Sequence, residues 1–359
     1  MLMELQACKT ITSKWNGTTL FSLLTGFKFK CVKLKHLLNY RSIYFYNLRI
    51  NSAVFTPLPN HTKSIIAKPF LKWAGGKTQL IPAIESYLPE NIKTLQDLTY
   101  VEPFIGSGAV FFWFIQTFDI KEAIINDVNA DLINVYRIIK NSPDALISLL
   151  EEIQNKYYGL LSEETKRDYF LQQRTLFNSK SETDIATAAL FIFLNRTCFN
   201  GLYRVNKNNE FNVPFGKYAK PRICDADNIL AISELLQKVT ILNGDYQDTL
   251  KFAGQNCFFY FDPPYKPISQ TASFNAYATG SFDDTEQERL AIFSEKLTAQ
   301  SKYWLLSNSD TKNINPDDDF FDQLYDKPSN TIVRVKAKRM INSNADKRGA
   351  INEILIMNY

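Results

Sequence analysis

Residues 100–116 read YVEPFIGSGAVFFWFIQ. The start predicts a short strand at residues 100–101, and residues 109–116 have the length and composition of a helix. Two glycines between them, Gly106 and Gly108, permit a tight turn and let a ligand approach the backbone. Strand, glycine turn and helix in this order are typical of nucleotide-binding α/β folds, although such a turn also occurs for purely structural reasons.

The next predicted strand, residues 123–126, leads into Asp127, about twenty residues after the glycine turn. A carboxylate at this point is placed to accept hydrogen bonds from ribose hydroxyls. Phe111 stands where a dinucleotide fingerprint would have its third glycine. The turn therefore favours an adenosine-containing ligand that need not be NAD.

Short apolar strands alternate with helical stretches from about residue 67 onward, which predicts an α/β protein. Further strands are expected at residues 239–243, 257–261, 303–307, 331–335 and 354–357. The last two are close enough in sequence to pair antiparallel. We therefore expect a Rossmann-like, mostly parallel sheet with a reversed last strand.

The chain divides into three parts. Residues 129–218 form a helical insertion, with a capping box expected at Ser181 and Asp184, between the two pieces of the α/β domain, residues 67–128 and 219–359. Residues 1–66 have no helical or strand period, and we expect them to be disordered or outside the fold.

This first segment is also strongly basic. Residues 1–68 carry ten Lys or Arg and one acid, a charge of +9, which leaves −5 for the rest of a chain whose total is +4. A transit peptide would explain the segment, and so would a translation start further along the chain.

Composition argues against several kinds of site. The five cysteines form no Cys-x-x-Cys pair, which argues against zinc or a disulfide framework and favours a reducing compartment. Both histidines, His36 and His61, precede the α/β domain, which therefore has no histidine for catalysis or metal binding. No apolar run approaches the roughly 20 residues of a membrane helix. We expect no metal and no membrane span.

Residues 74–78, AGGKT, have some likeness to a phosphate-binding loop, and residues 258–262 to its acidic partner strand. The loop pattern requires glycine at position 71, where the chain has Leu71. This mismatch argues against a nucleotide hydrolase.

The tetrapeptide Asp262-Pro263-Pro264-Tyr265 directly follows the predicted buried strand 257–261. Open α/β sheets bind ligands at the carboxyl ends of their strands. Prolines that merely stop a strand are the structural alternative. Asp262 also offers a carboxylate acceptor, the Pro-Pro pair fixes the direction of the Pro263 carbonyl, and Tyr265 offers an aromatic face for stacking a base.

These groups suit methylation of an exocyclic amine. The amino nitrogen of adenine is a poor nucleophile because its lone pair is delocalised, and two acceptors that hold its hydrogens favour a pyramidal nitrogen. Attack on a sulfonium methyl can then be direct and in line. Methylation at a ring carbon of cytosine would need a cysteine nucleophile, usually after proline, and none of the five cysteines follows a proline.

Six motifs resemble, in order and spacing, those of the Dam family of DNA adenine methyltransferases. They are residues 72–77 (KWAGGK), 102–108 (EPFIGSG), 126–127 (ND), 195–196 with 199–202 (NR and FNGL), 211–216 (FNVPFG) and 262–265 (DPPY). The resemblance covers about residues 68–359 and implies a class I methyltransferase fold.

The resemblance also implies residue roles. Catalysis would belong to Asp262, Pro263, Pro264 and Tyr265. S-adenosyl-L-methionine would be bound by Trp73, Lys77, Phe104, Gly106, Gly108, Asp127, Asp245 and Asp262. Residues 129–218 would recognise the target, with a hairpin at 200–217 that enters DNA. DNA would be contacted by Arg196, Asn200, Tyr203, Arg204, Lys217, Arg339 and Arg348.

Two further segments could meet DNA. A basic cluster near the end is either a DNA contact or a solvated face, and comprises Arg334, Lys336, Lys338, Arg339, Lys347 and Arg348. The polar loop 270–284 is expected to close over bound DNA.

By this resemblance, the protein is expected to methylate N6 of a flipped adenine in duplex DNA, within GATC, as part of a restriction-modification system. A cognate endonuclease would act separately on the same site, and the enzyme would be a cytoplasmic monomer or weak dimer. An RNA adenine methyltransferase is the alternative with the same chemistry, against which Asp262 and the insertion count. A non-catalytic nucleic-acid-binding module is the alternative of another class, against which the acceptor pair and the glycine turn count.

Overall fold

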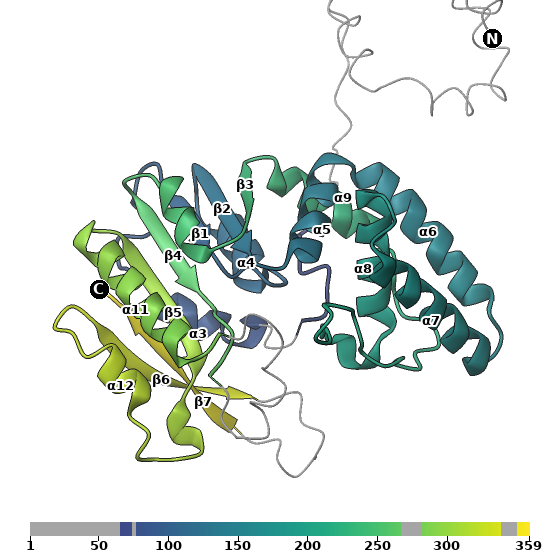
Figure 1. Ribbon diagram of the computed structural model, residues 1–359. Coiled ribbons are helices and arrows are strands. Elements are labelled where there is room, and N and C mark those ends of the chain that lie inside the picture. Colours follow the sequence, from purple (N-terminus) through teal and green to yellow (C-terminus); the bar gives the residue numbers. More distant parts are fainter. Residues whose placement is uncertain (1–64, 74–76, 267–281, 339–349) are drawn as a thin grey trace, which may run out of the picture. The chain divides into compact units, whose positions relative to one another are not determined.

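Seven strands form one sheet in the computed structural model, in the order β3-β2-β1-β4-β5-β7-β6 (Figure 1). The structure describes residues 65–73, 77–266, 282–338 and 350–359. Several predictions fall outside this range, namely those for residues 1–64, for most of the loop 270–284, and for Arg339, Lys347 and Arg348.

The strands are β1 (Thr99–Glu102), β2 (Glu122–Asp127), β3 (Val239–Asn243), β4 (Cys257–Phe261), β5 (Tyr303–Ser309), β6 (Thr331–Lys338) and β7 (Ala350–Met357). The first five run parallel, and β7 lies antiparallel between β5 and β6. The predicted mostly parallel sheet with a reversed last strand is confirmed.

Helices cover both faces of the sheet. Side chains along β4 point alternately to the two faces of the sheet. Phe258 and Tyr260 belong to one apolar core, and Phe259 and Phe261 belong to the other. The first core contains residues of α3 (Ile81–Ser86) and α4 (Ala109–Thr117), and the second contains residues of α11 (Asp284–Ala299) and α12 (Phe320–Leu324). All five residues of β4 are buried, as expected for a central parallel strand.

The insertion is helical, as predicted, and packs next to the β3 edge of the sheet (Figure 1). Its helices are α5 (Ala130–Asn141), α6 (Pro143–Gly159), α7 (Glu163–Ser179) and α8 (Asp184–Thr197), and α9 (Ala226–Leu236) packs against α5 and α6. The apolar side of α5 is buried, and it comprises Leu132, Ile133, Val135, Tyr136 and Ile139. Short 3-10 helices are η3 (Lys77–Gln79), η4 (Phe199–Gly201), η5 (Tyr246–Lys251) and η6 (Thr311–Asn313).

The capping box predicted at Ser181 and Asp184 is wrong. Asp184 is the first residue of α8, so the N-cap is Thr183, whose hydroxyl accepts from the Ala186 amide. The hydroxyl of Ser181 instead meets that of Ser179 at 2.7 Å. A capping box does form one helix earlier, at the start of α7.

Among the described helices, none is both long enough and apolar enough to cross a membrane.

Candidate active site

The predicted site residues gather at one edge of the sheet, where three neighbouring strands end. β1 leads into the glycine turn, β2 ends at Asp127, and Asp262 directly follows β4. β1 pairs in parallel with both β2 and β4, so all three carboxyl ends lie together. Parallel pairing thus brings together side chains that are far apart in the sequence.

The glycine turn is held by Asp127. Gly106 and Gly108 have φ angles of +46° and +73°, a conformation that suits glycine. The amide of Gly106 donates to Oδ2 of Asp127 at 3.1 Å, and the hydroxyl of Tyr136 donates to the Gly106 carbonyl at 3.0 Å. Burial raises the pKa of Asp127. Asp127 therefore shapes the turn, and its contact with a ribose stays a prediction.

Asp262 is paired with Lys77. The ammonium of Lys77, buried in η3, lies 2.9 Å from Oδ1 of Asp262. Burial raises the pKa of the Asp262 carboxyl, and the positive charge of Lys77 opposes that shift. This pair places a carboxylate acceptor at the end of β4.

Tyr265 is held over Lys77. Its hydroxyl donates to Oε2 of Glu353 at 2.9 Å and also contacts the ammonium of Lys77, which lies 4.2 Å from the ring centroid. The carbonyl of Pro264 accepts from the buried side chain of Gln287 at 3.2 Å. The four-residue motif is therefore anchored from η3, α11 and β7.

Sequence reasoning missed Glu353, which lies in β7 with only 13 % of its side chain exposed. The available signal was a carboxylate at the start of the otherwise apolar run Ile354–Met357. A buried charge in an inner strand is costly unless it has partners, and often has a function.

A second group lies around Asp245, two residues after the end of β3. Its Oδ1 caps η5 by accepting from the Gln247 amide, and its Oδ2 accepts from Arg289 of α11 at 2.5 Å. The guanidinium of Arg289 lies 4.9 Å from the ring centroid of Tyr246, which packs against Phe104 at 5.2 Å. A carboxylate beside aromatic rings suits a flat base with an amino group. Sequence reasoning did not single out Arg289.

Comparison with known proteins agrees with this geometry. Residues 73–341 match the model of the D12 class N6 adenine-specific DNA methyltransferase family. The chain belongs to this family. It is an adenine-specific DNA methyltransferase. Membership of this family argues against both earlier alternatives, an RNA methyltransferase and a non-catalytic binding module.

Curated relatives resemble the methyltransferase over nearly their whole length. The type II methyltransferase M.MjaIII of Methanocaldococcus jannaschii is 45% identical over 295 residues, covering 81% of this chain and 99% of the relative. The type II methyltransferase M1.LlaDCHI of Lactococcus lactis is 37% identical, with 81% and 95% covered. The DNA adenine methylase of Escherichia coli K12 is 35% identical, with 80% and 94% covered.

Trp73 and Tyr203, predicted for cofactor and DNA respectively, stack on each other in the methyltransferase. Their ring centroids are 5.8 Å apart with an interplanar angle of 18°, and Phe191 stacks on Tyr203 at 5.2 Å. A Cβ on Gly106 would come within 3.0 Å of the Trp73 ring. Trp73 thus lies between the glycine turn and Tyr203 of the insertion, and the contact of Tyr203 with bases stays a prediction.

The predicted hairpin has little regular pairing. Isolated bridges join Cys198 to Phe215 and Val205 to Phe211. Arg204 is exposed, and its Nε donates to Oδ1 of Asn212 at 2.7 Å. The other residues predicted to contact DNA have different surroundings. Asn200 is exposed, Lys217 forms an ion pair with Glu163 at 2.8 Å, and Arg196 donates to the Phe70 carbonyl at 2.7 Å.

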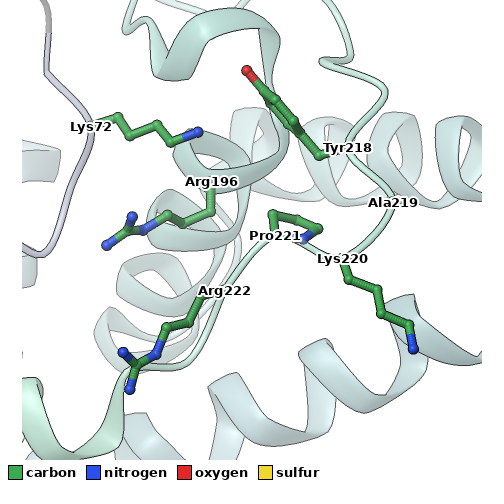
Figure 2. A pocket seen from close by; sticks show the side chains of 7 residues that line it. All are labelled: Lys72, Arg196, Tyr218, Ala219, Lys220, Pro221 and Arg222. Carbon is green, nitrogen blue, oxygen red and sulfur yellow. The ribbon is translucent and has the colours of Figure 1, made fainter.

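A basic cavity of about 270 Å³ lies beside the base of this hairpin (Figure 2). Its lining comprises Lys72, Arg196, Tyr218, Ala219, Lys220, Pro221 and Arg222. Arg222 is paired with Asp225 at 2.6 Å, and Lys72 lies over the Tyr218 ring. Four cationic side chains around one cavity favour an anionic ligand.

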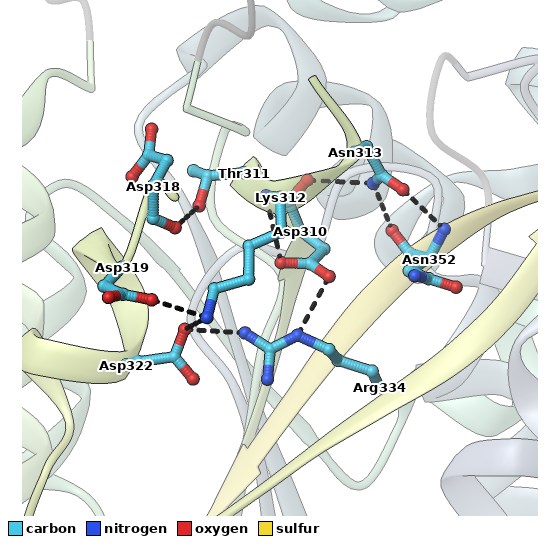
Figure 3. A network of polar contacts seen from close by, with 9 residues as sticks. All are labelled: Asp310, Thr311, Lys312, Asn313, Asp318, Asp319, Asp322, Arg334 and Asn352. Atoms are coloured by element: carbon cyan, nitrogen blue, oxygen red, sulfur yellow. Dashed lines mark hydrogen bonds and ion pairs between the residues drawn. The ribbon is translucent and has the colours of Figure 1, made fainter. Parts of the chain in front are cut away.

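Arg334, the first residue of the predicted basic cluster, is bound within the protein. Its guanidinium donates to Asp310 at 3.0 Å and to Asp322 at 2.6 Å (Figure 3). Arg334 is therefore already paired within the protein, whereas the charge run alone left open a DNA contact or a solvated face. Within the described ranges, no group of three or more His, Cys, Asp or Glu side chains could hold a metal ion.

Proposed function

We propose that this methyltransferase takes the methyl group from S-adenosyl-L-methionine and transfers it to N6 of an adenine rotated out of duplex DNA. The observation that carries the proposal is the Asp262 carboxylate at the end of β4, with the Tyr265 ring and the glycine turn beside it. The names of the relatives, DNA adenine methylase and type II methyltransferase, support the same reaction and a role in restriction-modification.

The residues present fit S-adenosyl-L-methionine. Asp245 would accept a hydrogen bond from its adenine amino group, and the adenine ring would lie against Phe104, which packs on Tyr246 next to Asp245. Gly106 and Gly108 let its amino-acid part approach the turn, near Trp73 and Lys77. When bound, this cofactor supplies a methyl group on a positively charged sulfur.

Asp262 and the Pro263 carbonyl would hold the two hydrogens of the target amino group. This hydrogen bonding favours a pyramidal nitrogen whose lone pair faces the methyl, and no covalent enzyme intermediate is needed. The ring of Tyr265 would stack on the flipped base. The methylated nitrogen must then release a proton, and burial makes Asp262 a better acceptor by raising its pKa.

The insertion, residues 129–218, would recognise the target sequence, which we propose to be GATC. Arg204 would read a base edge, and the DNA phosphate backbone would be bound by Arg196, Asn200 and Lys217. The cavity beside Arg196 would receive a phosphate. Since the substrate is cellular DNA, we place the enzyme in the cytoplasm as a monomer or weak dimer, with any cognate endonuclease acting separately.

Expression in a host without adenine methylation tests the proposal. Mapping of modified adenines should show methylation confined to GATC, with an Asp262→Ala variant as the negative control. Methylation at another sequence would refute the GATC assignment alone. Methylated adenine in host RNA and none in DNA would refute the DNA substrate.

A further inference from the structure

Glu353 lies in an inner strand of the sheet. β7 pairs with β5 on one side and β6 on the other, and Glu353 stands opposite Ser309 and Val335. A largely buried carboxylate in such a strand loses hydration and needs compensating contacts. Its contacts therefore indicate why a charge is kept there.

Those contacts belong to the active site. Oε2 of Glu353 accepts from the Tyr265 hydroxyl at 2.9 Å and lies 3.8 Å from the ammonium of Lys77. The same ammonium lies 2.9 Å from Asp262. Glu353 thus contacts Tyr265 of the catalytic tetrapeptide and lies near Lys77, which is the partner of Asp262.

The backbone next to Glu353 is anchored through Asn352. The amide of Asn352 donates to Oδ1 of Asn313 at 2.9 Å, and its carbonyl accepts from Nδ2 of Asn313 at 2.7 Å (Figure 3). The amide of Asp310 donates to the same carbonyl at 3.3 Å. Because η6 and the end of β5 hold β7 here, the Glu353 side chain starts from a fixed position.

We propose that Glu353 is a positioning residue for methyl transfer, acting through the hydroxyl of Tyr265. The hydrogen bond sets the orientation of the Tyr265 ring, on which the target adenine stacks. An aromatic ring that could rotate freely would hold the base less often in line with the methyl group. The inference rests on the proposed roles of Asp262 and Tyr265.

Single-turnover methylation of a duplex with one target adenine tests it in the full chain. Glu353→Ala should lower the rate constant about 10- to 100-fold, because a hydrogen bond to a charged group is lost. The concentrations of DNA and cofactor that give half the maximal single-turnover rate should change by less than about threefold. Glu353→Gln, which keeps an acceptor oxygen, should stay within about fivefold of the wild-type rate.

A double-mutant cycle separates positioning from general damage to the fold. Tyr265→Phe removes the same hydrogen bond from its other end, so the variant with both Glu353→Ala and Tyr265→Phe should be no slower than the slower single variant. Asp322→Ala is the matched control, since it disturbs the network around Arg334 without touching Tyr265, and its rate should equal that of the wild type.

A wild-type rate for Glu353→Ala or for Tyr265→Phe would overturn the inference, and so would additive effects in the double variant. If Glu353→Ala does not fold, Tyr265→Phe and Glu353→Gln still decide the matter. An Asp262→Ala variant made in parallel distinguishes the two levels: full activity there refutes the site assignment, whereas its inactivity beside a fully active Glu353→Ala refutes only the role of Glu353.

Discussion

The ammonium nitrogen of Lys77 lies 2.9 Å from a carboxylate oxygen of Asp262. Lys77 begins η3, ahead of the first strand, whereas Asp262 follows the fourth. The contact joins the first and last of the recognised motifs in one charged pair. It also stabilises the ionised form of a carboxyl that burial would otherwise make harder to ionise.

Replacing Asp262 tests its role in the reaction. Asp262→Asn keeps the size and one acceptor oxygen but loses the charge, and charge-assisted hydrogen bonds are about twice as strong as neutral ones. A loss of about 3 kcal/mol in the transition state would slow single-turnover methylation on the order of a hundredfold. Asp262→Ala should be slower still. Near wild-type methylation by Asp262→Ala would contradict the mechanism.

The acid limb of the rate should report the Asp262–Lys77 pair. The pKa of Asp262 is raised by burial and by Glu353 and lowered by Lys77, so activity should fall on acidification at a higher pH than for an exposed aspartate, whose pKa is about 3.9. Lys77→Met should move this limb to higher pH at saturating cofactor. An unchanged profile would show that Asp262 does not govern it.

Acidification should affect the stability of the fold in the opposite direction to the methylation rate. Because the folded state binds this proton more tightly than the unfolded chain does, acidification through the folded-state pKa favours folding at this residue. Loss of activity in that range, measured beside the melting temperature, should therefore not reflect unfolding at Asp262.

Arg204 should discriminate between sequences. It is exposed and held by Asn212, so it is oriented before DNA binds. Arg204→Ala should weaken discrimination by about 1–3 kcal/mol if the side chain reads a base edge. Lys217→Ala is the control, expected to weaken binding equally on all sequences. Uniformly weaker binding by Arg204→Ala would make Arg204 a phosphate contact instead.

Asp245 should contribute to cofactor affinity. Asp245→Ala removes the carboxylate between η5 and Arg289, and should weaken S-adenosyl-L-methionine binding by about tenfold or more, since hydrogen bonds to charged groups contribute about 1.5–3 kcal/mol. Equilibrium titration with cofactor measures this, and DNA affinity without cofactor is the control. Equal loss of both affinities would indicate damage to the fold.

Removal of residues 1–65 should leave folding and methyl transfer intact. Residues from Ser64 to the end form one compact unit, and its first buried side chains are those of Ala67, Phe70 and Leu71. The melting temperature of this truncation should match that of the full chain. A truncation that also removes residues 66–71 should lower it, because these three side chains leave the core. A large loss in the shorter truncation would show that the segment was misinterpreted.

Local patterns predicted the sheet well. The bounds of β3 and β4 agree with the expected strands, and other strands extend at most a few residues beyond them. Apolar runs bounded by turn residues carry this information within a short window. The capping box at Ser181 failed because the choice among several consecutive polar residues depends on where α8 begins.

The sequence by itself determined the α/β fold, the glycine turn after β1 and the carboxylate after β4, since each depends on neighbours in the chain. Only the tertiary structure decided that Asp127 holds the turn, that Trp73 stacks on Tyr203 and that Arg334 is already paired. The position of Glu353 in the active site depends most on the tertiary structure. The reversed strand β7 enters the sheet between β5 and β6, and this pairing across the chain brings its carboxylate to Tyr265, a contact that no local period encodes.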